Sequence, residues 1–96
     1  MHNVALSIAR QFYEDSHEPT KYWPKQYREK ASYEKWAANE IVRLLEQDQS
    51  NNSALTVSAF MKRIKKYATF NPKAYTMFMY AYSVAENVLD TIKAAM

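Results

Sequence analysis

Glu86 and Asp90 are the residues whose types and spacing come nearest to a catalytic or metal-binding pair. They stand four positions apart, so on a helix their carboxylates are neighbours that could exchange protons or hold a divalent cation. Lys93 follows closely, and an ordinary solvated helix end explains the pair better. The two histidines, His2 and His17, are not at metal-ligand spacing with a carboxylate. We therefore expect no enzyme activity, no cofactor and no metal site.

Phosphate binding is suggested by basic residues that no nearby acid balances. No acidic residue occurs between Asp48 and Glu86, and this interval contains Lys62, Arg63, Lys65, Lys66 and Lys73. At helical spacing the first four lie opposite an apolar row made of Val57, Phe60, Met61, Ile64 and Ala68. Such a face can follow a phosphate backbone without reading its sequence, or it can simply keep a small protein soluble. We take the five basic residues as candidate nucleic-acid-binding residues.

Aromatic and basic residues alternate through residues 21–36, KYWPKQYREKASYEKW. Cations interleaved with rings can stack single-stranded bases, and Trp, Tyr and Arg are also common in protein-binding hot spots. The alternative is that Tyr33 and Trp36 belong to the core, while Tyr22 and Trp23 fold the preceding linker back onto the domain. For partner binding we select exposed positions of this stretch and the outer face of the last helix: Tyr22, Trp23, Tyr27, Arg28, Met79 and Tyr80.

The last quarter of the chain, residues 71–96, is expected to form the helix against which the other helices pack. Asn71-Pro72 is a favourable helix start, and no charged residue occurs from Ala74 to Ala85. Apolar residues recur at helical spacing over about half of the circumference, wider than the stripe of an ordinary surface helix. This pattern predicts a central helix. It also favours a homo-oligomer through this C-terminal helix, because three short neighbours are not expected to cover so wide an apolar face.

Helical periodicity and breaking residues divide the rest of the chain into three further helices. We expect helices at about residues 4–14, 24–47, 56–68 and 72–95, in a single all-α domain that forms a compact four-helix bundle with a long central C-terminal helix. Pro19 and Pro24 interrupt the chain between the first two helices. Ser53 or Thr56 is expected to cap the third.

Composition limits the class of protein. Hydrophobic residues make up 48% of the 96 residues, enough for one core. The chain has no Cys, which excludes disulfides and thiolate sites. It also has no Gly, which excludes glycine-rich phosphate loops and leaves Asn or Asp for positive-φ positions. No uncharged run approaches the ~20 apolar residues of a membrane span, and no signal peptide is evident. We therefore expect a cytoplasmic protein without membrane contact.

The sequence thus favours a small non-enzymatic binding protein. Our first hypothesis is that it acts on or beside nucleic acid through the basic third helix. The alternative is a protein-binding regulator, inhibitor or adaptor that uses the aromatic second-helix stretch and the last helix. In that case the basic residues would attract an acidic protein surface.

Overall fold

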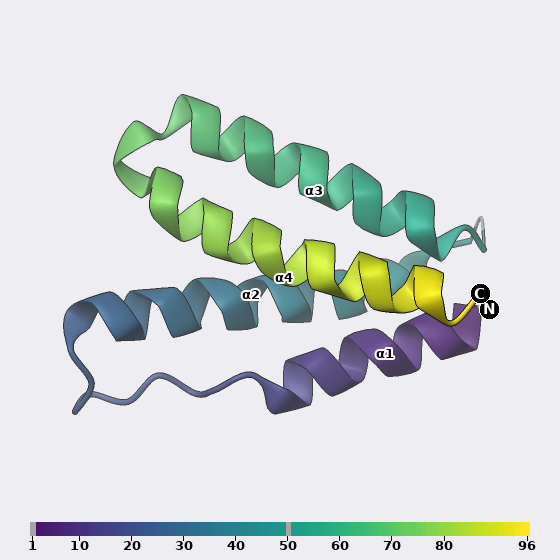
Figure 1. Ribbon diagram of the computed structural model, residues 1–96, viewed down its shortest axis with the longest axis horizontal. Helices are drawn as coiled ribbons and strands as arrows, with labels where there is room; N and C mark the ends of the chain where they lie inside the picture. The colour runs from purple at the N-terminus through teal and green to yellow at the C-terminus, as the bar shows by residue number, and fades with distance from the viewer. Residues whose placement is uncertain (1, 50) are drawn as a thin grey trace.

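The structure, a computed structural model, describes residues 2–49 and 51–96, and every regular element within them is helical. The elements are α1 (His2–Asp15), α2 (Lys25–Gln47), α3 (Ser53–Phe70), a short 3₁₀ helix η1 (Pro72–Ala74), and α4 (Tyr75–Ala94) (Figure 1). This arrangement confirms the predicted all-α, bundle-like fold.

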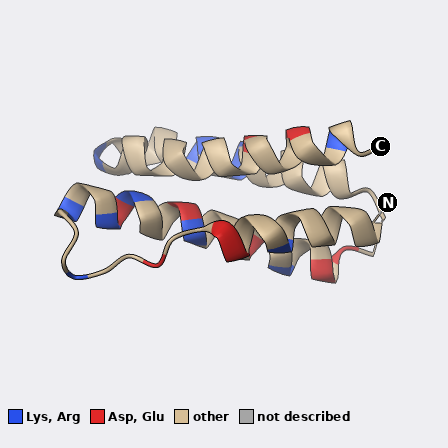
Figure 2. Ribbon diagram, turned by 60° about the horizontal axis from the view of Figure 1, so that its bottom comes forward, with Lys and Arg blue, Asp and Glu red and all other residues tan. Residues whose placement is uncertain are grey.

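Successive helices run in opposite directions along the bundle (Figure 1). α1 and α2 form one layer and α3 and α4 form the other (Figure 2). α4 contacts each of the other three helices, as expected of a central helix. The two chain ends lie together at one end of the bundle, and the α3–α4 turn and the start of α2 both lie at the opposite end (Figure 1).

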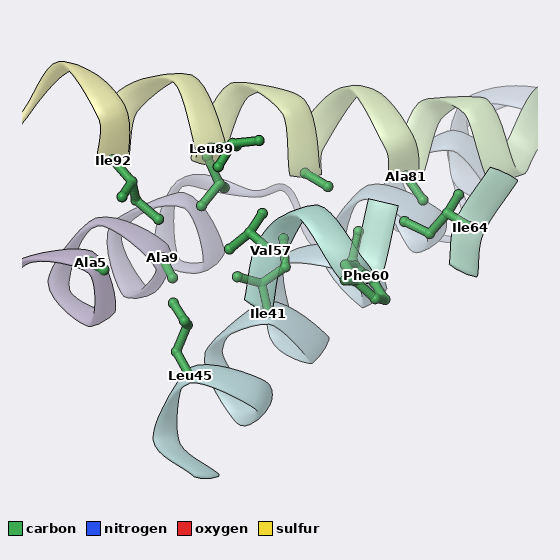
Figure 3. Close-up of a cluster of buried hydrophobic side chains, with 13 residues drawn as sticks. Ala5, Ala9, Ile41, Leu45, Val57, Phe60, Ile64, Ala81, Leu89 and Ile92 are labelled. Atoms are coloured by element: carbon green, nitrogen blue, oxygen red, sulfur yellow. The ribbon is translucent and has the colours of Figure 1, made fainter. Parts of the chain in front are cut away.

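The core lies where the four helices meet (Figure 3). α1 contributes Ala5 and Ala9, both 0% exposed, and alanine at a contact lets two helices approach closely. The larger fully buried side chains all come from the other three helices: Ile41, Leu45, Val57, Phe60, Ile64, Val88 and Ile92.

The wide apolar face of α4 is largely covered within one chain. Its buried residues are Ala81, Ala85, Val88, Leu89 and Ile92, and Phe78, Tyr82 and Val84 pack against the same core from its edges. The apolar width that favoured self-association is therefore used mainly to bind the chain's own helices.

Asparagine occupies positions at the helix ends where glycine is common in other proteins. Asn51 has φ of 57°, in the left-handed region that Asn tolerates better than most residues. Asn52 caps α3, because its Oδ1 accepts a hydrogen bond from the backbone N–H of Leu55 at 3.2 Å. At the other end of α3, Asn71 Nδ2 donates to the carbonyl oxygen of Tyr67 at 2.8 Å.

Some helix boundaries differ from the expected ones. α3 begins at Ser53, three residues early, because the cap is Asn52 and neither Ser53 nor Thr56. The last helix is divided, since Pro72–Ala74 forms a tight 3₁₀ turn before the α-helix starts at Tyr75. Short 3₁₀ turns are common at the start of α-helices. Within the described part of the chain, no helix combines the length and apolarity needed to cross a membrane.

Candidate nucleic-acid interface

α3 has one buried apolar face and one exposed basic face. Val57, Phe60, Ile64 and Ala68 are at most 1% exposed, because their spacing of three and four residues places them on the same side of the helix. The opposite side carries the four exposed cations Lys62, Arg63, Lys65 and Lys66. The separation of charged and apolar residues expected from the spacing is thus present in the structure. We call these four cations the α3 basic face.

No ion pair found in residues 2–49 and 51–96 uses the α3 basic face or Lys73. The pairs join Arg10 to Glu46, Lys25 to Glu29, Lys35 to Glu18, and Arg43 to Glu40. Because acidic neighbours do not neutralise it, the positive charge of α3 is available to a polyanion.

Two of the four cations, Arg63 and Lys65, lie near aromatic rings on opposite sides of α3. Arg63 Cζ lies 5.4 Å from the centroid of the Phe60 ring, and Lys65 Nζ lies 5.4 Å from that of Tyr82 on α4. Cation–π contacts of this kind hold the side chains in place. Lys62 and Lys66 fall between them on the helix circumference, so the four cations spread over a broad arc.

Arg63 marks the border between the α3 basic face and α2. Its positive charge reaches Glu40 of α2, whose pKa is lowered chiefly by a hydrogen bond from Arg43 and less by the charge of Arg63. Glu40 is already bound to Arg43 on its own helix. Arg63 therefore keeps its hydrogen-bond donors for another ligand.

Lys73 extends the positive charge to one end of the bundle. It lies in η1, in the turn that joins α3 to α4. In the α3–α4 layer the cations other than Lys93 extend from the middle of α3 to this turn, whereas the acids of the layer, Glu86 and Asp90, lie in the second half of α4, which leads to the chain ends. Figure 2 shows the basic and acidic residues of this layer. The layer is therefore basic at the turn end and more acidic at the other.

The paired carboxylates do not form part of a larger site in the described residues. Glu86 and Asp90 are both exposed on α4. Within the ranges 2–49 and 51–96, no group of three or more His, Asp or Glu side chains is placed to hold a metal ion.

The candidate partner-binding residues at the start of α2 have different environments. Tyr22 is 84% exposed, so the expectation that it fastens the linker to the domain is wrong. Its neighbour Trp23 is partly buried and meets the His17 ring edge-on, with centroids 6.2 Å apart. Trp23, Pro24 and Tyr27 line a shallow hollow of about 290 Å³, and Tyr27 is exposed.

Met79 and Tyr80 are not on a fully exposed outer face of α4, which corrects the expectation. Both are partly buried, and the Tyr80 ring centroid lies 5.1 Å from Lys30 Nζ on α2. Tyr80 lies next to the buried face of α4, on the side of α4 that faces α2. Arg28 is also partly buried. It stands two positions before Lys30, on a different side of α2, so Tyr80 and Arg28 do not share one surface.

A cluster of aromatic side chains from three helices was not expected from the sequence. Phe78 of α4 lies at its centre, with ring centroids 5.4 Å from Tyr33, 5.8 Å from Tyr67 and 6.4 Å from Trp36. Trp36 also lies 5.6 Å from Phe60. We call these five residues the aromatic cluster. Trp36 is 38% exposed and Tyr67 is 40% exposed, so the cluster reaches the surface.

One signal for this cluster was available in the sequence. Trp36 lies at the edge of the apolar stripe of α2, and a large ring at an edge position is often shared between core and surface. That the neighbouring rings come from α3 and α4 depends on how the helices pack, which spacing within one helix does not reveal.

Comparisons with family models, curated proteins and solved structures return no match. A binding surface is supported by the charges, the exposed side chains and the ring contacts of α2, α3 and α4.

Proposed function

We propose that this chain is a non-enzymatic binding protein that holds nucleic acid through phosphate contacts from the α3 basic face, extended by Lys73. One observation carries the proposal: the α3 basic face has four exposed cations, and none of them enters an ion pair in the described residues. Lysine binds a phosphate as a point charge, and arginine can bind it with two parallel hydrogen bonds.

The arrangement of the cations suits a backbone ligand. At 100° per residue they cover an arc of about 160°, from Lys65 on one flank of α3 to Arg63 on the other. A surface of this width can meet several phosphates without contacting base edges. We expect the resulting affinity to depend little on nucleotide sequence and to fall with salt concentration.

Fluorescence anisotropy with labelled single-stranded and duplex oligonucleotides, at roughly 50 mM salt, tests this function. The double variant Lys62→Gln/Lys66→Gln should bind more weakly than wild type. Arg10→Gln/Lys93→Gln is the matched control, because it removes the same net charge from exposed positions outside α3. Absence of wild-type binding, or an equal loss in both double variants, would show that α3 is not a phosphate-binding surface.

A second candidate function is supported by the exposed aromatic residues at the start of α2. Tyr22 is 84% exposed and Tyr27 is 55% exposed, beside the hollow that Trp23 helps to line. A regulator or adaptor using this surface would bind its protein partner with little salt dependence and would lose affinity in a Tyr27→Ala variant. Nucleic-acid binding should show the opposite behaviour in both tests.

We also propose the cytoplasm as the place of action, since nucleic acid is available there. Self-association through α4 stays a prediction. Because the apolar face of α4 is covered within the chain, a dimer would have to use the opposite side of α4, which Met79 and Tyr80 flank. Sedimentation of wild type and a Met79→Ser variant tests this, and a monomeric wild type would contradict it.

A further inference from the structure

The aromatic cluster opens into a hollow between α2 and α4. Ser32, Tyr33, Trp36 and Phe78 line this hollow, whose volume is about 310 Å³. That is close to the lower limit for pockets that bind small ligands, and rings from α2 and α4 supply most of its lining. A hollow of this size and lining suits one flat unsaturated ring.

A second hollow, which is basic, adjoins the first. It is also about 310 Å³ in volume and is lined by Lys25, Arg28, Glu29, Ser32 and Tyr33, so the two hollows share Ser32 and Tyr33. Arg28 Nε is buried and has no hydrogen-bond partner. Because Arg28 lines this hollow, its guanidinium can turn towards an acceptor there, such as a phosphate oxygen, and give this unpaired donor a partner.

Cations flank the aromatic cluster on the α3 side as well. Arg63 lies over the ring of Phe60, which in turn lies 5.6 Å from the ring of Trp36. Two acids close to these cations already have ion-pair partners. Glu29, which lines the basic hollow, pairs with Lys25 at 3.8 Å, and Glu40 pairs with Arg43. The aromatic cluster thus has positive groups on both sides.

Given the nucleic-acid binding proposed above, on which this inference rests, we propose that the preferred ligand is single-stranded. An unpaired base stacks against Trp36 and Phe78 in the aromatic hollow. The phosphates that flank it are held by Arg28 on one side and by Arg63 and the rest of the α3 basic face on the other. Stacking platforms beside cationic grooves are the usual means of binding single strands.

Charge and shape favour this occupant over two others. A duplex keeps its bases paired and stacked, so it could use the cations but not the aromatic hollow. An apolar peptide would fill the hollow but would leave the cations on both sides without partners, at a cost in desolvation. A single strand uses both kinds of group.

Tryptophan fluorescence reports directly on the aromatic hollow. In a Trp23→Phe background Trp36 is the only tryptophan, and we expect its emission to be quenched when oligothymidylate is added at roughly 50 mM salt. A duplex of the same length should bind more weakly and should not quench. In anisotropy assays, Trp36→Leu should weaken single-strand binding by roughly 5- to 100-fold, because one stacked base is lost.

Tyr75→Leu is the matched control for Trp36→Leu, since Tyr75 is an exposed ring on α4 outside the aromatic cluster, and it should bind as wild type does. If Trp36→Leu does not fold, as judged by circular dichroism, the quenching measurement on the Trp23→Phe protein decides the question alone.

The outcomes separate the two proposals. Equal binding of single strand and duplex without quenching would overturn the single-strand inference and leave the phosphate-binding function standing. No nucleic-acid binding at all would overturn both. Quenching by polyglutamate in that case would identify an acidic protein as the ligand class.

Discussion

The salt dependence of binding gives the sharpest test of the α3 basic face. If Lys62, Arg63, Lys65 and Lys66 each contact one phosphate of a single strand, these four contacts alone should make the logarithm of the association constant fall with the logarithm of salt concentration at a slope of about −2.8, and contacts from Lys73 and Arg28 add about −0.7 each. For the four contacts alone, a change from roughly 50 to 200 mM salt weakens binding about 50-fold.

The variant Lys62→Gln/Lys66→Gln removes two of these four contacts. Its slope should be shallower than that of wild type by about 1.4, so the same change in salt should weaken binding about 7-fold less than in wild type. Anisotropy titrations of labelled oligothymidylate at several salt concentrations measure both slopes. The control Arg10→Gln/Lys93→Gln should keep the wild-type slope.

Two results would refute this reasoning. If the Lys62→Gln/Lys66→Gln variant binds more weakly but keeps the wild-type slope, these lysines act without releasing counterions from phosphates. If the control variant loses slope to the same extent, net charge rather than the position of the cations determines binding.

The remaining predictions concern stability. Asn52→Ala should lower the free energy of unfolding in urea by about 1 kcal/mol, because the backbone N–H of Leu55 loses its cap; an unchanged midpoint would contradict the capping role. Ala9→Leu should cost about 1–3 kcal/mol, because Ala9 is 0% exposed and has no room for a larger side chain; a fully stable variant would mean that α1 packs loosely. The pKa of Glu40 is lowered, chiefly by the hydrogen bond from Arg43, so this carboxylate stabilises the fold above its ordinary pKa, and the stabilisation is lost as pH falls through the lowered value. Glu40→Gln should therefore unfold at a lower temperature than wild type at neutral pH and converge with it as the pH falls below the lowered pKa, and a constant difference would argue against this linkage.

Helix type and helix faces could be predicted from the sequence because they follow from local spacing. The row from Val57 to Ala68 and the opposite cations are properties of one helix, and the structure has both. The start of α3 was harder to predict. Asn52, Ser53 and Thr56 are all good capping residues, and only the backbone geometry shows that Asn52 accepts the capping bond.

Contacts between side chains of different helices could not be predicted from the spacing of residues within each helix. Spacing put Tyr80 on the outside of α4, but the contact with Lys30 depends on how α2 packs beside it. Likewise, Tyr67 and Trp36 are 31 positions apart, and only the packing of α2 and α3 around Phe78 brings them into one cluster. The composition of a binding surface made by three helices is therefore a tertiary property.

The back-and-forth course of the helices has a practical consequence for experiments. Both chain ends lie at one end of the bundle, and η1, with Lys73, lies at the other (Figure 1), along a longest dimension of 39 Å. A biotin or fluorescent protein attached at either terminus is thus remote from the turn end. Molecules anchored to a sensor chip in this way should all present that end to the solution.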